Sequence, residues 1–403
     1  MRILLTVKTP EEAAAMIRDR FQVLKKTAES IGTADALGRS LDHDVVAEEH
    51  VPGFDRATVD GYAVIASDTF GCSESMPAVL TLSGEVMMGE AACGALSPGK
   101  CIAVSTGGDL PEGADAVIMV EHTEDYGDGL VGMLSPAAPG NNIIFKGDDV
   151  SPGDKVLAAG TLLSPSDIGI LSALGLCEVA VRPKPVVGVI STGDELVDPS
   201  QTPGRGQVRD VNTPMLIAMA ERFGAATRNY GIIRDDEDAL RGGVMRAAAE
   251  CDIVLISGGS SAGMRDLTAR VIESAGELLF HGIAMKPGKP TILGVIDNKP
   301  VFGLPGHPVA AFFVTELFVR PLIAGLMGAG VRRKTTSARI SEAVSSNHGR
   351  AEYIAVFLDD GVARPIRGKS GLIASLAGAD GYICIPRDSE GLAAGTLVTV
   401  TYF

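Results

Sequence analysis

The sequence predicts a multi-domain protein in which a three-layer α/β domain follows an inserted β-rich domain and precedes a C-terminal β-barrel. Between residues 184 and 328, β-branched apolar runs alternate with helix-like stretches, as expected of buried parallel strands covered by helices. On both sides of this region, short apolar runs alternate with Gly/Pro turns, which is typical of small β domains. The chain has 403 residues, enough for about two to four domains at roughly 100–200 residues each.

Composition and charge exclude several classes of protein. Hydrophobic residues make up 46% of the chain but aromatic residues only 4%, so the cores are expected to be largely aliphatic. The net charge of −15 argues against a nucleic-acid partner, which would need a basic face. The six cysteines include no CxxC pair, which indicates reduced thiols. The apolar run at the start of the chain is too short for a signal peptide. The most apolar helix candidate is interrupted by Glu316 and Arg320, which disfavours a membrane span. We expect a soluble, cytoplasmic protein without a membrane span.

The N-terminal third is predicted to contain two interleaved domains. Thr9-Pro10-Glu11-Glu12 has the pattern of a helix start, with an N-cap Thr, Pro at the first helical position and acidic residues in the first turn. Residues 1–50 and 150–183 are predicted to form a helical and extended linker domain, with further helices at 33–41 and 166–174. Residues 51–149 are predicted to form the inserted β-rich domain, with strands at 78–85, 100–105, 116–120 and 129–133.

The remaining chain is predicted to contain the α/β domain and the barrel. In the α/β domain, residues 184–328, we expect strands at 186–190, 229–233, 253–257 and 301–304. Helices are expected at 214–223, 239–250 and 266–275, followed by a closing helix at 308–326. Residues 329–403 are predicted to form a C-terminal β-barrel with strands at 337–341, 353–358, 381–386 and 396–402.

Three Gly-rich segments follow strands of the α/β domain, where an open α/β sheet places its ligands. Gly lets the backbone approach a ligand, and a helix N-terminus favours an anion. Lys286 and Lys289 of a KPGKP segment would add charges for phosphate. A single loop of this kind is often only a tight turn, but three on one sheet edge favour ligand binding. The candidate substrate-binding residues in these loops are Ser191, Thr192, Gly193, Ser257, Gly258, Gly259, Ser260, Ser261, Pro305, Gly306, His307 and Pro308.

Carboxylates are expected at the same edge. Glu195, Asp235 and Asp266 all follow strands of the α/β domain. Acidic side chains beside phosphate-binding loops make chemical sense if a hard divalent cation bridges them, and Mg²⁺ is the usual choice. The alternative is that they are solvated loop acids or helix N-caps. Two segments of the β-rich domain, around Asp60 and Thr106, are by themselves typical of structural turns.

Together these segments resemble the molybdopterin molybdenumtransferase family, which includes bacterial MoeA and the E domain of gephyrin. DGYAV, TGGDLPEGADAVI, STGDEL, SGGSSAG, KPGKP and GLPGHPVAA occur over nearly the whole chain, in the order found in the family. The resemblance implies a MogA-like catalytic domain and an elongated homodimer. It also implies insertion of molybdate into adenylylated molybdopterin with release of AMP, in the presence of Mg²⁺. Each active site would lie between the α/β domain of one subunit and the DGYA domain of the other.

The resemblance also implies roles for individual residues. Asp60, Glu195, Asp235 and Asp266 match the functional acids of the family, and the last three would bind Mg²⁺. Thr106 matches a loop threonine, and Pro305 and Pro308 would shape the loop near the pterin.

Four departures from the family pattern lie near the expected ligands: that at His307 affects the expected pterin contacts, and those at Ala355 and Gly282 remove two possible anion contacts. His307 stands where the family frequently has Asn, and Ser261-Ala262 lies in a loop that usually reads VSVG. Ala355 and Gly282 stand where many or some members carry a basic residue. We expect Arg350 and Ser370 to serve as molybdate contacts instead.

Several alternatives remain within this resemblance. An adenylyltransferase would need the α/β domain but neither DGYA nor the barrel, and a gephyrin-type scaffold usually adds a second domain and a linker. Tungstate insertion is equally compatible, because tungstate and molybdate are tetrahedral dianions of almost equal size. Transient contacts with the adenylyltransferase and with molybdoenzyme apoproteins would be the expected protein partners.

Overall fold

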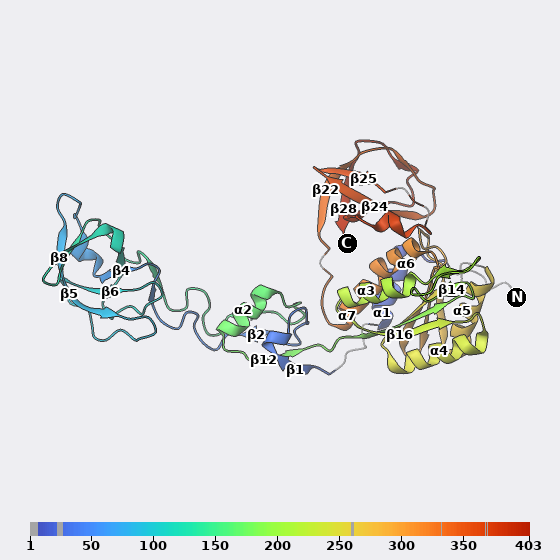
Figure 1. Ribbon diagram of the computed structural model, residues 1–403, viewed down its shortest axis with the longest axis horizontal. Helices are drawn as coiled ribbons and strands as arrows, with labels where there is room; N and C mark the ends of the chain where they lie inside the picture. The colour runs from blue at the N-terminus through green and yellow to red at the C-terminus, as the bar shows by residue number, and fades with distance from the viewer. Residues whose placement is uncertain (1–6, 22–26, 259–261, 332, 367, 369) are drawn as a thin grey trace. The chain divides into compact units, whose positions relative to one another are not determined.

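The computed structural model describes residues 7–21, 27–258, 262–331, 333–366, 368 and 370–403. The chain divides into two compact units (Figure 1). Residues 1–42, 159–164 and 179–403 form what we call the large unit, and residues 43–158 and 165–178 form the small unit. This division is coarser than the four predicted domains, whose boundaries stay a prediction.

The first helix, α1 (Pro10–Phe21), begins at the predicted residue, and a capping box stabilises its N-terminus. The backbone N–H of Glu12 donates to Thr9 Oγ1 at 3.2 Å, and the N–H of Thr9 donates to Glu12 Oε2 at 2.9 Å. Ala13, Ile17 and Phe21 recur at helical spacing and are buried in the core of the α/β domain. This apolar stripe joins α1 to the α/β domain.

The helix predicted at 33–41 is wrong. Only a single 3₁₀ turn, η1 (Thr33–Asp35), forms there. Gly38 then adopts a positive φ of 71°, which ends any helical path. Ser40 and Leu41 instead form β-bridges with Leu162 and Val181, so long-range backbone pairing overrides the local helical pattern.

A six-stranded sheet forms the centre of the α/β domain, in the order β16-β13-β17-β21-β20-β18. The first four strands are parallel, which confirms the predicted doubly wound architecture. The last two are antiparallel and were not predicted. Asp297 and Asn298, with φ of 50° and 61°, form the two-residue turn that joins β20 to β21. The strands are β13 (Val186–Thr192), β16 (Ala226–Ile233), β17 (Ile253–Gly258), β18 (Glu277–His281), β20 (Ile292–Ile296) and β21 (Lys299–Leu304).

Helices cover both faces of this sheet (Figure 1). On one face, α1 packs with α3 (Asn212–Arg222) and with the closing helix, which consists of α6 (Pro308–Val314), the π-helical turn η4 (Thr315–Val319) and α7 (Arg320–Leu326). On the other face lie α4 (Glu237–Glu250) and α5 (Ala262–Ala275). The closing helix is long and apolar enough to span a membrane, but 61% of its most apolar window is buried. It is therefore packed as a core helix.

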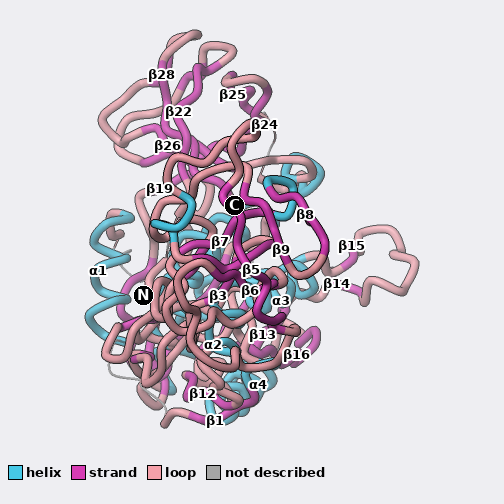
Figure 2. Tube along the Cα trace, turned by 90° about the vertical axis from the view of Figure 1, so that its left-hand side faces the viewer, coloured by secondary structure: helices cyan, strands magenta, loops and turns pink. Residues whose placement is uncertain are grey.

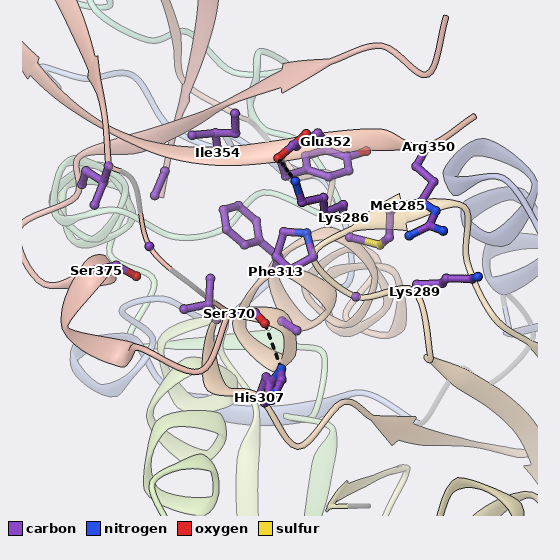
Figure 3. A pocket seen from close by; sticks show the side chains of 18 of the residues that line it. Met285, Lys286, Lys289, His307, Phe313, Arg350, Glu352, Ile354, Ser370 and Ser375 are labelled. Atoms are coloured by element: carbon purple, nitrogen blue, oxygen red, sulfur yellow. Dashed lines mark hydrogen bonds and ion pairs between the residues drawn. The ribbon is translucent and has the colours of Figure 1, made fainter. Parts of the chain in front are cut away.

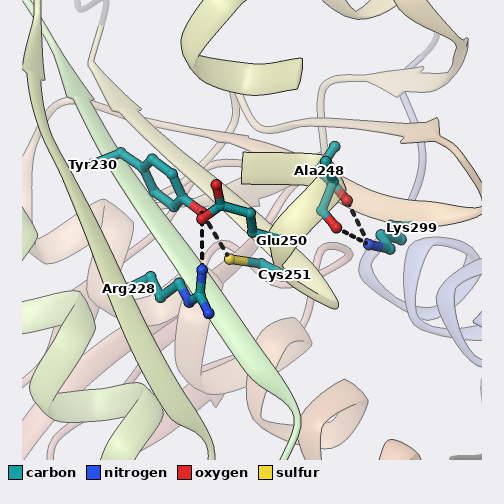
Figure 4. A network of polar contacts seen from close by, with 7 residues as sticks. Arg228, Tyr230, Ala248, Glu250, Cys251 and Lys299 are labelled. Atoms are coloured by element: carbon teal, nitrogen blue, oxygen red, sulfur yellow. Dashed lines mark hydrogen bonds and ion pairs between the residues drawn. The ribbon is translucent and has the colours of Figure 1, made fainter. Parts of the chain in front are cut away.

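Polar side chains fasten the exposed edge of the sheet to the end of α4 (Figure 4). Arg228 Nη1 donates to Glu250 Oε2 at 2.6 Å, and the Tyr230 hydroxyl donates to the same oxygen at 2.9 Å. Burial, followed by hydrogen bonds with Cys251 and Glu250, raises the pKa of the Tyr230 phenol. Lys299 Nζ donates to the carbonyl oxygen of Ala248, one of the last carbonyls of α4. These contacts are explained by the fold alone.

The C-terminal strands close into the predicted barrel (Figure 2). The order β24-β25-β22-β28-β26 returns to β24, so five strands form a closed ring without edges. Its strands are β22 (Thr335–Ile340), β24 (Ala351–Asp359), β25 (Val362–Pro365), β26 (Gly381–Ile385) and β28 (Leu397–Tyr402). A short segment of the α/β domain, β19 (Met285–Lys286), pairs in parallel with the start of β24. The KPGKP segment is thereby attached to the barrel.

The small unit is built on a second six-stranded sheet, in the order β7-β4-β6-β5-β9-β8. Four of these strands were predicted, and β4 and β8 were not. Side chains alternate between its two faces, so Cys101 and Ile102 enter different cores. The strands are β4 (Gly61–Val64), β5 (Ala78–Val86), β6 (Lys100–Val104), β7 (Ala116–Met119), β8 (Thr123–Gly127) and β9 (Leu130–Met133).

The remaining elements are short. They are β1 (Glu29–Gly32), β2 (Val45–Val46), β3 (Arg56–Ala57), η2 (Ala66–Thr69), η3 (Val120–His122), β10 (Ile143–Ile144), β11 (Lys155–Leu157), α2 (Pro165–Ala173), β12 (Glu178–Val181), β14 (Leu196–Val197), β15 (Val208–Arg209), β23 (Val344–Ser345), η5 (Ile373–Leu376) and β27 (Gly391–Leu392).

An aromatic cluster packs the barrel against the closing helix. The Phe313 ring of α6 lies edge-on to the Tyr382 ring of β26, with centroids 5.8 Å apart. Phe403 packs edge-on against Phe312 at 4.9 Å. Such pairs contribute about 0.5–1.5 kcal/mol beyond the area that they bury. The cluster therefore sets how the barrel meets the α/β domain.

We expect Phe313→Ala to lower the free energy of unfolding of the large unit by about 3–5 kcal/mol, because it empties a buried aromatic site. Phe313 is 1% exposed. Urea unfolding followed by circular dichroism measures the change. Phe357→Ala is the matched control, since that ring is 45% exposed on β24 and its loss should stay within about 0.5 kcal/mol. Equal effects of the two substitutions would contradict the role given to the cluster.

Candidate active site

Three parallel strands end side by side at one edge of the α/β sheet. Thr192 at the end of β13 is paired in register with Gly258 at the end of β17. Ser257 of β17 is in turn paired with Leu304 at the end of β21. The segments after these strands therefore begin at the same edge, as expected from the sequence. Gly259, Ser260 and Ser261 of the middle segment lie outside the described residues.

Two glycines allow the close approach of backbone and side chains at this edge. Gly258 has a φ of 158°, and a Cβ atom there would lie 2.1 Å from the carbonyl oxygen of Thr192. Gly193 has a φ of 153°, and a Cβ atom there would lie 2.6 Å from Glu195 Oε2. Any other residue at either position would force its neighbour to move. The absence of a Cβ atom at Gly193 thus lets the Glu195 carboxylate lie close to the backbone of its own loop.

A cavity of about 640 Å³ opens at this edge. Its wall includes predicted residues from all three segments and further residues from the start of α3. The predicted residues are Thr192, Glu195, Ser257, Gly258, Gly306, His307 and Pro308. We call this the edge cavity. Its size and its mixture of backbone, hydroxyl and carboxylate groups suit a small polar ligand.

A buried network behind the edge cavity was missed by sequence reasoning. Asp210, which is 4% exposed, accepts hydrogen bonds from the backbone N–H groups of Asn212 and Thr213 and from the Thr213 hydroxyl. Asn212 Nδ2 donates to Ser257 Oγ at 2.8 Å and to the carbonyl oxygen of Gly306 at 2.9 Å. Asn212 thus ties two of the three segments together. The available signal was Asp-x-Asn-Thr directly before a predicted helix, which looks like ordinary helix capping.

The same network withdraws Ser191 from the cavity. Ser191 is 1% exposed, and its hydroxyl lies 2.7 Å from that of Thr213. Because Thr213 donates its own proton to Asp210, the Ser191 hydroxyl must donate to Thr213. The structure therefore places this predicted ligand donor in the interior, where it supports the start of α3.

The predicted carboxylates are only partly brought together. Thr192 Oγ1 donates to Asp235 Oδ1 at 3.0 Å, which holds Asp235 beside the end of β13. The neighbouring Asp236 is a helix N-cap, since its side chain accepts from the N–H of Ala239. Asp266 lies in α5, but its side chain is outside the described part of the chain. Among the described side chains, no group of three or more His, Cys, Asp or Glu is arranged to hold a metal.

A second cavity, of about 810 Å³, lies between the α/β domain and the barrel (Figure 3). The side chains of Lys286, Lys289 and Arg350 line it. The pairing of β19 with β24 brings Lys286 opposite Glu352, and Lys286 Nζ lies 2.7 Å from Glu352 Oε1. Lys289 and Arg350 form no ion pair with any residue in the described part. We call this the cationic cavity.

The predicted molybdate contacts Arg350 and Ser370 both line the cationic cavity, together with Pro305 and His307. The Ser370 hydroxyl and His307 Nδ1 lie 2.8 Å apart and share a hydrogen bond (Figure 3). Ala355, at which many family members carry Arg, lines the same wall. The participation of Glu352 was not predicted, because its contact with Lys286 depends on strand pairing between two domains.

In the small unit, Asp60 and Thr106 form a contact of their own. Asp60 Oδ1 accepts a hydrogen bond from the Thr106 backbone N–H at 2.6 Å and from the Thr106 hydroxyl at 2.9 Å. These two bonds, the backbone bond more than the side-chain bond, hold the pKa of Asp60 below its ordinary value. Asp60 is therefore a firmly ionised carboxylate on the surface of the small unit.

The α/β domain, with a glycine-lined edge cavity, has the architecture of a molybdopterin-binding domain. Three sequence-family models match the chain in order: "MoeA N-terminal region (domain I and II)" at residues 8–175, "Probable molybdopterin binding domain" at 188–325, and "MoeA C-terminal region (domain IV)" at 337–403.

Relatives and solved structures extend this similarity over the whole chain. The molybdopterin molybdenumtransferase of Bacillus subtilis is 32% identical over 92% of this chain and 89% of its own length. Molybdopterin molybdenumtransferase 2 of Mycobacterium tuberculosis is 34% identical, with coverages of 92% and 94%. The crystal structure of a molybdopterin biosynthesis MoeA protein from Pyrococcus horikoshii OT3 matches with a TM-score of 0.87 and 38% identity, covering 99% of this chain and 100% of that one. The chain belongs to the molybdopterin molybdenumtransferase family.

We expect Thr106→Val to raise the pKa of Asp60 without returning it to the ordinary value of 3.8. The substitution removes the hydroxyl donor but keeps the backbone N–H, which has the larger effect. A pH titration of the Asp60 carboxyl by NMR measures the change. The native hydrogen bonds stabilise the fold above the unfolded-state pKa, and this contribution is lost as the pH falls through the lower folded-state pKa. An unchanged midpoint would show that the hydroxyl does not act on Asp60.

Proposed function

We propose that this chain inserts molybdate into adenylylated molybdopterin and releases molybdenum cofactor, AMP and water in the cytoplasm. The observation that carries this proposal is the placement of two cavities on either side of one loop, residues 305–308. One cavity is lined by Gly-rich strand ends, and the other by three cationic side chains. The first suits an adenylylated pterin, and the second suits a tetrahedral dianion.

The edge cavity would bind the adenylylated pterin. Gly258 and Gly306 would present backbone groups to the pyrophosphate, as strand-end loops of α/β sheets do. Asn212 would keep the segments at Ser257 and Gly306 at a fixed separation. This rigidity matters because a positioned ligand reacts faster than a loosely held one.

Glu195, Asp235 and Asp266 are the residues proposed to hold Mg²⁺ here. Glu195 lines the edge cavity, and its carboxylate has no hydrogen-bond or ion-pair partner among the described residues. Asp235 Oδ1 is held by Thr192, so the carboxylate has a defined orientation. Two hard oxygen donors near an expected pyrophosphate fit Mg²⁺. When bound, the cation would offset the negative charge of the phosphates.

The cationic cavity would bind molybdate. Lys289 and Arg350 carry charges that no ion pair in the described part neutralises, whereas Glu352 holds Lys286 in place. Such a local concentration of positive charge is needed to attract a dianion to a chain of net charge −15. Removing the Arg350 guanidinium would weaken this attraction without disturbing the strand pairing of β24, which is a backbone interaction.

Purified protein supplied with adenylylated molybdopterin, Mg²⁺ and molybdate is expected to release AMP and insert molybdenum together. Both products are followed in one reaction, with tungstate in a parallel reaction to establish which oxyanion is used. EDTA should suppress AMP release, because the phosphate charge would then be unbalanced. No molybdenum insertion by folded protein would refute the proposed function, and AMP release that is insensitive to EDTA would refute the Mg²⁺ site.

We also propose that the protein acts as a homodimer in which Asp60 of one subunit serves the α/β domain of its partner. Asp60→Asn and Asp266→Ala should each be inactive as folded dimers. When the two variants exchange subunits, about half of the dimers contain one subunit of each variant. Each of these heterodimers has one intact site and one doubly damaged site, so activity should return to roughly a quarter of the wild-type value. A mixture that exchanges subunits and stays inactive would place both acids in a site made by one chain.

A further inference from the structure

The edge cavity and the cationic cavity share part of their walls. His307, in the loop before α6, lines both of them. The barrel segment opposite this loop, residues 370–371, also contributes to the walls of both cavities. Ser370 faces the cationic cavity, whereas the next residue, Gly371, lines the edge cavity. His307 and Ser370, joined by their hydrogen bond of 2.8 Å, therefore form a partition between the two cavities (Figure 3).

The backbone on both sides of the partition is anchored by hydrogen bonds to its carbonyl oxygens. The N–H of Val309 in α6 donates to the carbonyl oxygen of Ser370 at 3.1 Å, which holds the barrel segment against the loop. On the other side, Asn212 Nδ2 donates to the carbonyl oxygen of Gly306, next to His307. The backbone of the partition is thus fixed, and what remains adjustable is the His307 side chain.

The His307 side chain is exposed although it lies between two cavities. Ser370 engages only Nδ1, and the described part of the chain provides no hydrogen bond to Nε2. An exposed side chain keeps rotamer freedom until a ligand restricts it, and restricting it has an entropic cost. A ligand in either cavity would meet the same ring, so the second ligand to bind would find it already ordered.

We propose that His307 and Ser370 couple the two cavities, so that a nucleotide in the edge cavity tightens the binding of an oxyanion in the cationic cavity. This inference rests on the proposed function, because that function assigns the two ligands. His307 is here a positioning residue: it transmits the presence of one substrate to the site of the other. The coupling favours the state in which both substrates are bound, which is the only state that can react.

The coupling is measured by titrating molybdate into the full-length protein by calorimetry, with and without saturating AMP and Mg²⁺. We expect AMP to lower the Kd of molybdate by about fivefold, and molybdate to lower the Kd of AMP by the same factor. Physiological ionic strength is used because it reduces the repulsion between the two anions, which acts in the opposite direction.

Variants separate coupling from binding. We define the coupling factor as the Kd of molybdate without AMP divided by its Kd with saturating AMP. His307→Ala and Ser370→Ala should bring this factor to one or below, whatever each substitution does to the affinity for either ligand alone. His307→Asn should keep most of the coupling, because its amide occupies the position of Nδ1 and reaches Ser370. Ser375→Ala is the matched control: it lines the cationic cavity, but its hydroxyl donates to the carbonyl oxygen of Leu372 instead of contacting His307, so the factor should stay near five.

The outcomes distinguish this inference from the function on which it rests. A wild-type protein that binds both ligands with a coupling factor of one overturns the inference and leaves the proposed function standing. A factor that survives in both His307→Ala and Ser370→Ala overturns it as well. A wild-type protein that binds neither ligand overturns the proposed function and the inference together. If His307→Ala does not fold, Ser370→Ala, which removes a single oxygen atom, gives the same decision.

Discussion

The parallel register of β13, β17 and β21 is the constraint on which the edge cavity depends. It brings Ser191, Ser257 and Leu304 level with one another, so three segments from distant parts of the chain begin at one edge. The backbones approach so closely there that a Cβ atom at Gly258 would lie 2.1 Å from a carbonyl oxygen. Asn212 then bridges two of the segments from α3. A change in the register of one strand would displace the segment that follows it relative to the other two.

The second cavity arises because the α/β domain shares a strand pairing with the barrel. The segment between β18 and β20 leaves its own sheet and pairs through β19 with β24. This pairing places Lys286 against Glu352, and it brings the second lysine of KPGKP into the cavity wall with Arg350. The aromatic cluster around Phe313 keeps the barrel in position behind the cavity. The cationic cavity is therefore a product of domain packing, whereas the edge cavity is a product of sheet topology.

Positive charge is concentrated in the cationic cavity of an acidic chain. The chain as a whole is acidic, with a net charge of −15, but the cationic cavity gathers Lys286, Lys289 and Arg350 with only one carboxylate paired to them. The acidic net charge of the chain disfavours polyanions, whereas the three cationic side chains of this cavity can attract a small anion. On the small unit, Thr106 keeps Asp60 ionised through two hydrogen bonds. Asp60, Asp235 and Lys286 are thus each held by a specific neighbour.

Local patterns in the sequence determined the helix start at Thr9, the parallel strands and four of the five barrel strands, with β25 the exception. Capping and apolar periodicity act over a few residues, so a local pattern can reveal them. They also placed the Gly-rich segments at one edge, since parallel strands must end together. Only the tertiary structure decided the strand pairing of β19, the contact of Lys286 with Glu352 and the burial of Ser191. It likewise replaced the helix expected at 33–41 with β-bridges. Each of these depends on groups more than twenty residues apart meeting in space, and no local period or propensity encodes such a meeting.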